Sequence, residues 1–306
     1  MSSSDSWLRN AGAAARIAAD RGDLWLPGAL GALTYLAWLP LVLTVAAAPR
    51  QSDLAFLGAS LFSSDLFPLN VLLIATLAAL GVLIACLLAA YAEASLLRAA
   101  GLGTPGRSMT QELEATFSVM LIALLPGVAV AAAVISGVAA VAPSEFGAPD
   151  LGVPLLVRIA LHLVPLLVAL AVVVWLGQAV GSVAIRRAIG PAALPVGAAV
   201  KAALRDLIEH PLRRLGLALT SFLADLLAVG LAVALLRVLW APIGADLAGG
   251  QLVSPSALLL LVGFVAIWLA VTLAFGALHV WVSTWWSLEL GADPEAATPK
   301  AQEVGV

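Results

Sequence analysis

Six long apolar runs constrain this chain more than any other feature of its sequence. They extend over residues 24–48, 69–97, 116–142, 154–185, 215–240 and 257–288. A helix needs about 20 apolar residues to cross the hydrocarbon core of a bilayer, whereas the strands of a membrane β-barrel alternate in segments of about 10 residues. The chain is 62% hydrophobic and only 11% charged, which is typical of a membrane protein and not of a soluble domain.

We therefore predict an all-α fold, a polytopic membrane bundle of six transmembrane helices with interfacial amphipathic helices. Residues 1–291 are expected to form one transmembrane domain, followed by a disordered cytoplasmic tail at 292–306 that is polar and rich in small residues. Pro126 and Pro165 lie inside apolar runs, where each removes one backbone hydrogen bond and is expected to kink its helix. Residues 7–21 alternate apolar and charged side chains at helical spacing, which favours an interfacial helix over a frayed tail.

The basic residues are distributed unequally between the two ends of these runs. Of the 15 Lys and Arg residues, only Arg50, Arg158 and Arg237 fall on one side. Short loops rich in Lys and Arg remain on the cytoplasmic side of a membrane. Both termini are therefore predicted to be cytoplasmic. The Ala/Leu/Val-rich, Lys-poor composition favours a bacterial plasma (inner) membrane.

The densest basic segment, residues 186–214, joins the fourth run to the fifth. Its basic residues are Arg186, Arg187, Lys201, Arg205, Arg213 and Arg214. An amphipathic helix is predicted over 196–209, with one apolar face of Val196, Val200, Ala203, Leu204 and Leu207. Its other face carries Lys201, Arg205, Asp206 and Glu209. Attraction to anionic lipid, at about 1 kcal/mol per basic residue, accounts for such a segment; docking of a cytoplasmic partner protein, such as an ATPase, is the alternative.

The second, fourth and sixth runs end alike. A glycine stands at each exit, where a left-handed cap is favourable: Gly101, Gly190 and Gly291. A short amphipathic segment precedes each odd-numbered run: residues 7–21, 109–117 and 196–209. Such self-similarity indicates three tandem hairpin repeats: residues 5–101, 102–190 and 191–291. The alternative is that all membrane hairpins share these features.

The pattern resembles a group of bacterial six-span membrane proteins that includes the membrane domain attached to some glycerophosphodiester phosphodiesterases. The resemblance rests on the six spans, the basic linker KAALRDLIEHPLRRLG at 201–216 and the glycine-terminated even spans. It covers most of the chain. Because no phosphodiesterase domain is present, the resemblance implies an anchoring or accessory membrane module and does not imply that activity.

Four polar side chains inside the runs are candidates for a substrate or proton path: Glu93, Gln178, Asp225 and His279. Polar groups are costly in lipid and usually face the interior of a bundle. At about 1.5 Å per residue from the basic boundary, the last three lie about 13–17 Å deep, near the bilayer midplane. Glu93 is shallower and is expected to pair with Arg98. Asp225 is either a functional acid or a buried hydrogen-bonding group, with His279 or Gln178 as its expected partner.

Gly177 and Gly181 form a small-xxx-small face that permits close helix contact, either within the bundle or between copies of the chain in a homo-oligomer.

The sequence carries no signature of a catalytic, metal or cofactor site. It lacks a G-x-x-x-x-G-K-[ST] phosphate loop, an H-E-x-x-H pair and a G-x-S-x-G elbow, and nothing in it resembles a nucleic-acid motif. We expect a non-enzymatic accessory, anchoring or assembly module in contact with the lipid bilayer. A transport permease, as the membrane half of an ATP-driven exporter, is the first alternative. A membrane-embedded enzyme using Asp225 and His279 is the second.

The unequal distribution of basic residues predicts the result of reporter fusions. Fusions after Gly147 and after Ala248 are expected to report the outer side, because each position follows a span that leaves the basic side. A fusion at Arg205 in the basic segment is the control and is expected to report the cytoplasm. A cytoplasmic signal at Gly147 or Ala248 overturns the orientation.

Overall fold

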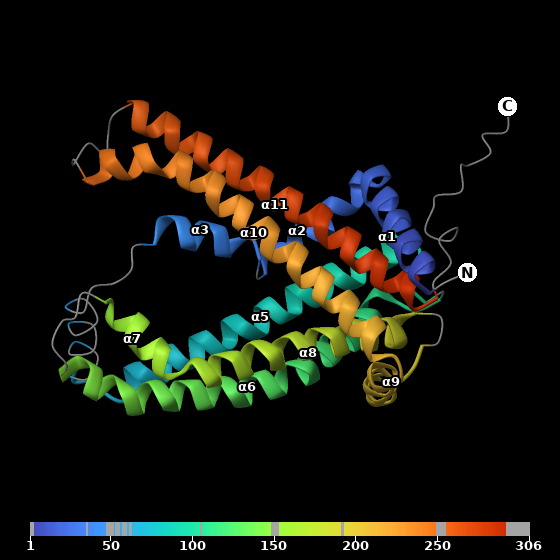
Figure 1. The fold of residues 1–306 in the computed structure, drawn as a ribbon, viewed down its shortest axis with the longest axis horizontal. Helices are drawn as coiled ribbons and strands as arrows, with labels where there is room; N and C mark the ends of the chain where they lie inside the picture. The colour runs from blue at the N-terminus through green and yellow to red at the C-terminus, as the bar shows by residue number, and fades with distance from the viewer. Residues whose placement is uncertain are drawn as a thin grey trace. The chain divides into compact units, whose positions relative to one another are not determined.

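A computed structural model shows an all-α chain (Figure 1). The structure describes residues 3–34, 36–46, 52, 56, 60, 63–104, 106–147, 153–190, 193–248 and 255–291, and these include no strand. Five helices are long and apolar enough to cross a membrane, and a bent helix pair is a sixth span if its two parts count as one. The predicted membrane helical bundle is therefore confirmed. The predicted tail at 292–306 lies outside the described residues.

The five long helices expose most of their apolar surface. They are α5 (Leu69–Ala99), α6 (Met109–Gly147), α8 (Val164–Ile189), α10 (Pro211–Ala248) and α11 (Pro255–Glu289). In the most apolar stretch of α5 none of the residues is buried. Helices satisfy their own backbone hydrogen bonds, so such surfaces are stable against hydrocarbon. The chain is an integral membrane protein whose outer surface contacts lipid.

The first apolar run is a broken span and not one straight helix. It comprises η1 (Gly22–Leu24), α2 (Trp25–Leu33) and α3 (Trp38–Val45), with a bend of 51° between the first two elements and α3. Pro40 has no N–H to donate to the Leu36 carbonyl, and a proline in the first turn of a helix removes no hydrogen bond. A new helix therefore begins at Trp38, just before this proline.

Prolines act differently in the fourth and third runs. The fourth run is divided at Leu163 between α7 (Leu155–His162) and α8, because Pro165 has no N–H to donate to the Leu161 carbonyl and fits in the first turn of a new helix. Pro126 instead lies inside the uninterrupted helix α6. That helix begins at Met109, so the prediction of a separate amphipathic segment at 109–117 is wrong.

The other two predicted amphipathic segments are separate helices. They are α1 (Ser3–Asp20) and α9 (Val196–Glu209), and α9 has the predicted bounds. Gly101 (φ 74°) and Gly291 (φ 91°) adopt the predicted left-handed conformation after α5 and α11. At the third exit the left-handed residue is Ala193 (φ 44°). Gly190 is needed there for space, since a Cβ would collide with the Arg186 carbonyl.

The chain divides into two compact units. One comprises Met1–Ala46, Ala85–Met120 and Ala179–Val306, and the other comprises Ala47–Ile84 and Leu121–Gln178. These boundaries fall inside the first two proposed repeats, and the third repeat lies wholly in the first unit. The tandem repeats therefore stay a prediction.

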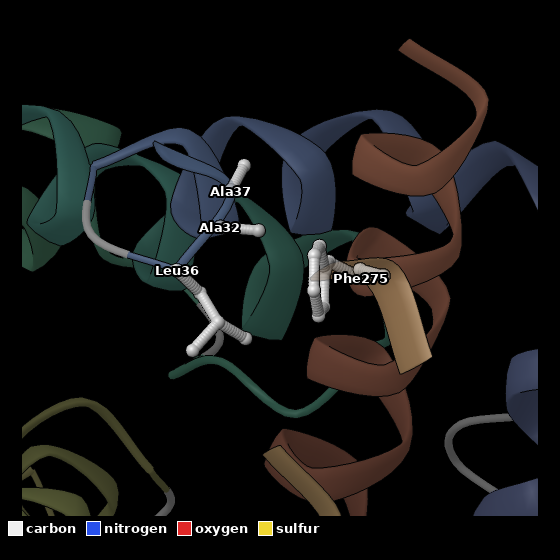
Figure 2. Packing of buried hydrophobic residues seen from close by; sticks show 5 residues of the cluster. Ala32, Leu36, Ala37 and Phe275 are labelled. Atoms are coloured by element: carbon white, nitrogen blue, oxygen red, sulfur yellow. The ribbon is translucent and has the colours of Figure 1, made fainter. Parts of the chain in front are cut away.

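The core of the first unit depends on close contact between α2 and α11. A Cβ on Gly276 would lie 2.7 Å from the Ala29 nitrogen, and one on Gly28 would collide with the Gly276 carbonyl. Beside this contact lies a hydrophobic cluster in which Ala32, Leu36 and Ala37 gather near the Phe275 ring (Figure 2). Small residues let the two backbones approach, which gains van der Waals contact that lipid cannot replace.

The segment between α5 and α6 caps the C-terminus of α8. The Thr104 hydroxyl donates to the carbonyls of Ile189 and Gly190, at 2.8 Å each, and Arg107 Nη1 donates to the Ala188 carbonyl at 2.6 Å. The last carbonyls of a helix have no partner within the helix, and a cation there also opposes the negative end of the helix dipole. The loop is thereby held against the end of α8.

The α2–α11 contact predicts opposite effects of two glycine substitutions in one helix. Gly276→Ala is expected to lower the thermal unfolding midpoint in detergent, because its methyl group collides with the backbone of α2. Gly263→Ala has nothing within 4 Å of the new methyl group and is expected to stabilise α11 by up to about 1 kcal/mol through helix propensity. Equal midpoint shifts of the two variants would contradict this packing.

Candidate functional site

Polar side chains from three spanning helices meet inside the first unit. Glu93 comes from α5, Arg186 from α8, and His279, Ser283 and Ser287 from α11. We call these five residues the Glu93 network. The side chains of Glu93 and Arg186 are each only 7% exposed.

The Glu93 carboxylate is satisfied at both oxygens. Oε1 accepts hydrogen bonds from Arg186 Nη2 at 3.0 Å and from Ser283 Oγ at 2.9 Å. Oε2 lies 3.1 Å from His279 Nε2. A buried carboxylate is tolerated when it is paired with a cation and hydrogen-bonded in this way.

The Arg186 guanidinium also uses all three of its nitrogen atoms. Nε donates to Ser287 Oγ at 3.1 Å, Nη1 to the Ser182 carbonyl at 2.9 Å, and Nη2 to the Ser283 carbonyl at 2.7 Å as well as to Glu93. Taking a charge out of water costs several kcal/mol, and only a complete set of partners offsets that cost. The network is therefore neutral in total when His279 is neutral, and it is internally hydrogen-bonded.

Helix periodicity explains how α11 supplies three members. His279, Ser283 and Ser287 are spaced by four residues and so lie on one helix face. Gly31 of α2 leaves room for the imidazole, since a Cβ there would lie 3.2 Å from His279 Nε2. The second, fourth and sixth spans each contribute a polar group to the network eight residues before the exit glycine. These groups are Glu93, the Ser182 carbonyl and Ser283.

The predicted partner of Glu93 is wrong. Glu93 pairs with Arg186 and His279, whereas Arg98 Nε lies 3.2 Å from Glu112 Oε2 of α6. Five residues along a helix turn through about 500°, so Arg98 and Glu93 point about 140° apart. Because α6 begins at Met109, its first turn places Glu112 beside Arg98.

The other three candidates are not brought together as expected. His279 contacts Glu93, and among the described residues no hydrogen bond joins Asp225 of α10 to His279 or Gln178. Asp225 is half-buried and lies within electrostatic range of His279. Gln178 is exposed and belongs to the second unit. The predicted hydrogen bond of Asp225 is therefore absent from the described residues.

Of the two glycines predicted to pack helices, Gly177 makes a close backbone contact. A Cβ on it would lie 2.7 Å from the Ala123 carbonyl of α6. Gly181 is buried in α8. A larger side chain at Gly177 would need the backbone of α6 to move.

Four of the six predicted membrane-surface basic residues are engaged in ion pairs, and that of Arg205 with Glu209 is exposed and long, at 3.9 Å. Arg186 belongs to the Glu93 network. Arg214 Nε donates to Asp206 Oδ2 at 2.7 Å, and Arg213 Nε donates to Glu289 Oε2 at 2.6 Å. Asp206 is buried, whereas Lys201, Arg205 and Glu209, which were predicted on the same face of α9, are exposed. Lys201 and Arg205 are exposed, and Arg187 is half-buried.

Sequence reasoning missed Arg186 as a buried partner, together with Ser283, Ser287 and Glu289. An arginine directly after a predicted span is expected at the membrane surface, so the type and position of Arg186 pointed away from burial. The only signal was the shared register of Glu93, Ser182 and Ser283 before the exit glycines. That register brings polar groups to one level of the bundle.

No family model, curated protein or solved structure matches this chain. Within the described residues, no three His, Cys, Asp or Glu side chains are grouped so as to hold a metal ion. The Glu93 carboxylate with three donors and the Arg186 guanidinium with five acceptors form a link between α5, α8 and α11.

Arg186→Leu tests whether the network holds the helices together. This variant leaves Glu93 buried without its cation and is expected to lower the free energy of unfolding by about 3–5 kcal/mol. Arg205→Leu is the matched control, because Arg205 is exposed and pairs with Glu209 only at 3.9 Å, a contact that contributes about 0–1 kcal/mol. Unfolding in a denaturing detergent titration measures both. Similar stabilities of the two variants would show that the network is not a stabilising link.

Proposed function

We propose that this protein is a non-enzymatic accessory, anchoring or assembly module of a bacterial inner membrane, with both termini in the cytoplasm. One observation carries the proposal: the strongest concentration of polar groups in the described bundle is a closed Glu93 network. A catalytic or transport site needs acid, base or ligand-binding groups that a substrate can reach. Here the ion pair is buried and its hydrogen bonds are used to join α5, α8 and α11.

Two further features support this proposal. The Lys and Arg residues lie almost entirely on the side of the termini, which favours the cytoplasmic orientation. The resemblance to membrane domains attached to phosphodiesterases supports an anchoring or accessory role. A homo-oligomer packed through Gly177 and Gly181, and a cytoplasmic partner at 186–214, belong to the same proposal.

A transport permease is the second candidate, and Asp225 favours it. This carboxyl group lies eleven residues beyond Arg214 in α10, is half-buried, and has no hydrogen bond among the described residues. Its neighbour His279 contacts Glu93, so a proton path would run from Asp225 through His279 to the network. An enzyme that uses Asp225 and His279 together would instead need His279 free, and its Nε2 is bonded to Glu93.

Asp225→Asn separates these two candidates. The variant is expressed in a strain from which the native gene is deleted. The accessory role predicts that it complements the deletion as fully as the native chain does, because an amide keeps the size and polarity of the side chain. A permease that moves protons predicts loss of activity, since an amide cannot carry the proton.

The control for this experiment is the amount of folded protein in the membrane, which the Asn variant is expected to leave unchanged. The same two chains in liposomes with a pH-sensitive dye inside give the direct measurement. Proton entry above that of protein-free liposomes, abolished by Asp225→Asn, would contradict the accessory role and establish the permease.

A further inference from the structure

Helix α9 is connected to membrane spans at both of its ends. Only His210 separates it from Pro211, where α10 begins, and residues 190–195 connect it to the end of α8 at Ile189. Six residues extend about 20 Å at most. Figure 1 shows α9 nearly end-on, crosswise to α10. The helix therefore lies at the level where the spans leave the bilayer.

One side of α9 packs on the first unit and another side is uncovered. Ala199, Ala203 and Asp206 are buried. Leu204 is 47% exposed and Ile208 is 78% exposed. Leu204 and Ala203 both belong to the apolar face predicted from the sequence. Ala203 is buried against the protein, whereas Leu204 is exposed. Large apolar side chains one turn apart at this level are typical of a helix that lies in the membrane interface.

Two exposed basic side chains border this apolar side. At 100° per residue, Lys201 lies about 20° and Arg205 about 60° around the helix from Ile208, while Leu204 lies about 40° to the other side. Both basic residues are exposed. The nearest acidic groups do not cancel them: Asp206 is paired with Arg214 at 2.7 Å, and the exposed contact of Glu209 with Arg205 measures 3.9 Å.

Lipid fits this surface better than a protein partner does. A stable protein interface buries about 1,200–2,000 Å², whereas the uncovered apolar side of α9 presents two large side chains next to two cations. Such a helix inserts its apolar side about 5–10 Å into the boundary between headgroups and acyl chains, and its Lys and Arg residues contact anionic headgroups. The surrounding apolar helices already require lipid on the same unit.

We propose that α9 is an interfacial lipid-binding helix, with Leu204 and Ile208 inserted among the acyl chains and Lys201 and Arg205 on the phosphates of anionic lipids. Arg186, Arg213 and Arg214 take no part, because they are engaged in ion pairs within the protein. In the cell, α9 meets anionic lipids only if it lies at the cytoplasmic leaflet, and this part of the inference rests on the orientation in the proposed function. Lipid binding by α9 in bilayers of fixed composition does not depend on that orientation or on the accessory role.

The test uses the full chain with one fluorescent label in nanodiscs that hold a single copy. The natural Cys86 is replaced by Ala, and an environment-sensitive dye is attached at Ile208→Cys or, as the matched control, at Glu209→Cys. Glu209 is the next residue, is also exposed, and lies about 100° further around the helix. Phosphatidylcholine and phosphatidylglycerol carrying a spin label near the headgroup are the quenchers.

We expect strong quenching at position 208 by both lipids, more by phosphatidylglycerol, and weak quenching at position 209. Combining Lys201→Gln with Arg205→Gln is expected to remove the preference for phosphatidylglycerol, by about five-fold in relative association for each basic residue, and to leave quenching by phosphatidylcholine unchanged. Both substitutions change exposed residues, and size-exclusion chromatography checks that the doubly substituted chain remains folded.

Three results overturn the proposal or a part of it. Equal quenching at positions 208 and 209 would show that α9 has no inserted side. A label at position 208 that is shielded from aqueous iodide but not quenched by lipid would show that protein, from this chain or a partner, covers the helix. An unchanged preference for phosphatidylglycerol in the Gln variant would overturn the role of Lys201 and Arg205.

Discussion

The buried ion pair between Arg186 and Glu93 is the interaction on which the first unit of this protein depends. Both charges lie inside a bundle surrounded by hydrocarbon, where neither is tolerated alone. Besides pairing with each other, Arg186 donates to the carbonyls of Ser182 and Ser283, and Glu93 accepts a hydrogen bond from the Ser283 hydroxyl. Because these partners come from three helices, the charges are stable only when α5, α8 and α11 are assembled in one register.

Close packing of small residues supplies the precision that this pairing needs. Apolar side chains alone do not fix the register of membrane helices, since lipid is as apolar as they are. Gly28 and Gly276 bring the backbones of α2 and α11 into contact, and Gly31 leaves the space that His279 occupies beside Glu93. The polar network and the glycine contact thus act on the same helix, α11, from two sides.

Much of the fold could be predicted from the sequence because the bilayer imposes it. Run length predicted the spanning helices, and the amphipathic pattern of residues 196–209 predicted the bounds of α9. The bend before Trp38 and the partners of Glu93 could not be predicted in this way. Arg186 is near the end of a span, where snorkelling to the surface and burial against a carboxylate have similar sequence signals. Only the packing of three helices decides between them.

The central claim is that Glu93 and Arg186 stabilise the fold as a pair, and a double-mutant cycle tests it most directly. The free energy of unfolding is measured for the native chain, Glu93→Leu, Arg186→Leu and the double variant. The account predicts that the double variant is more stable than the sum of the single losses implies, with a coupling of about 1–3 kcal/mol, as for residues in one ion-pair network. Losses that add to within about 0.5 kcal/mol, as for independent sites, would contradict it.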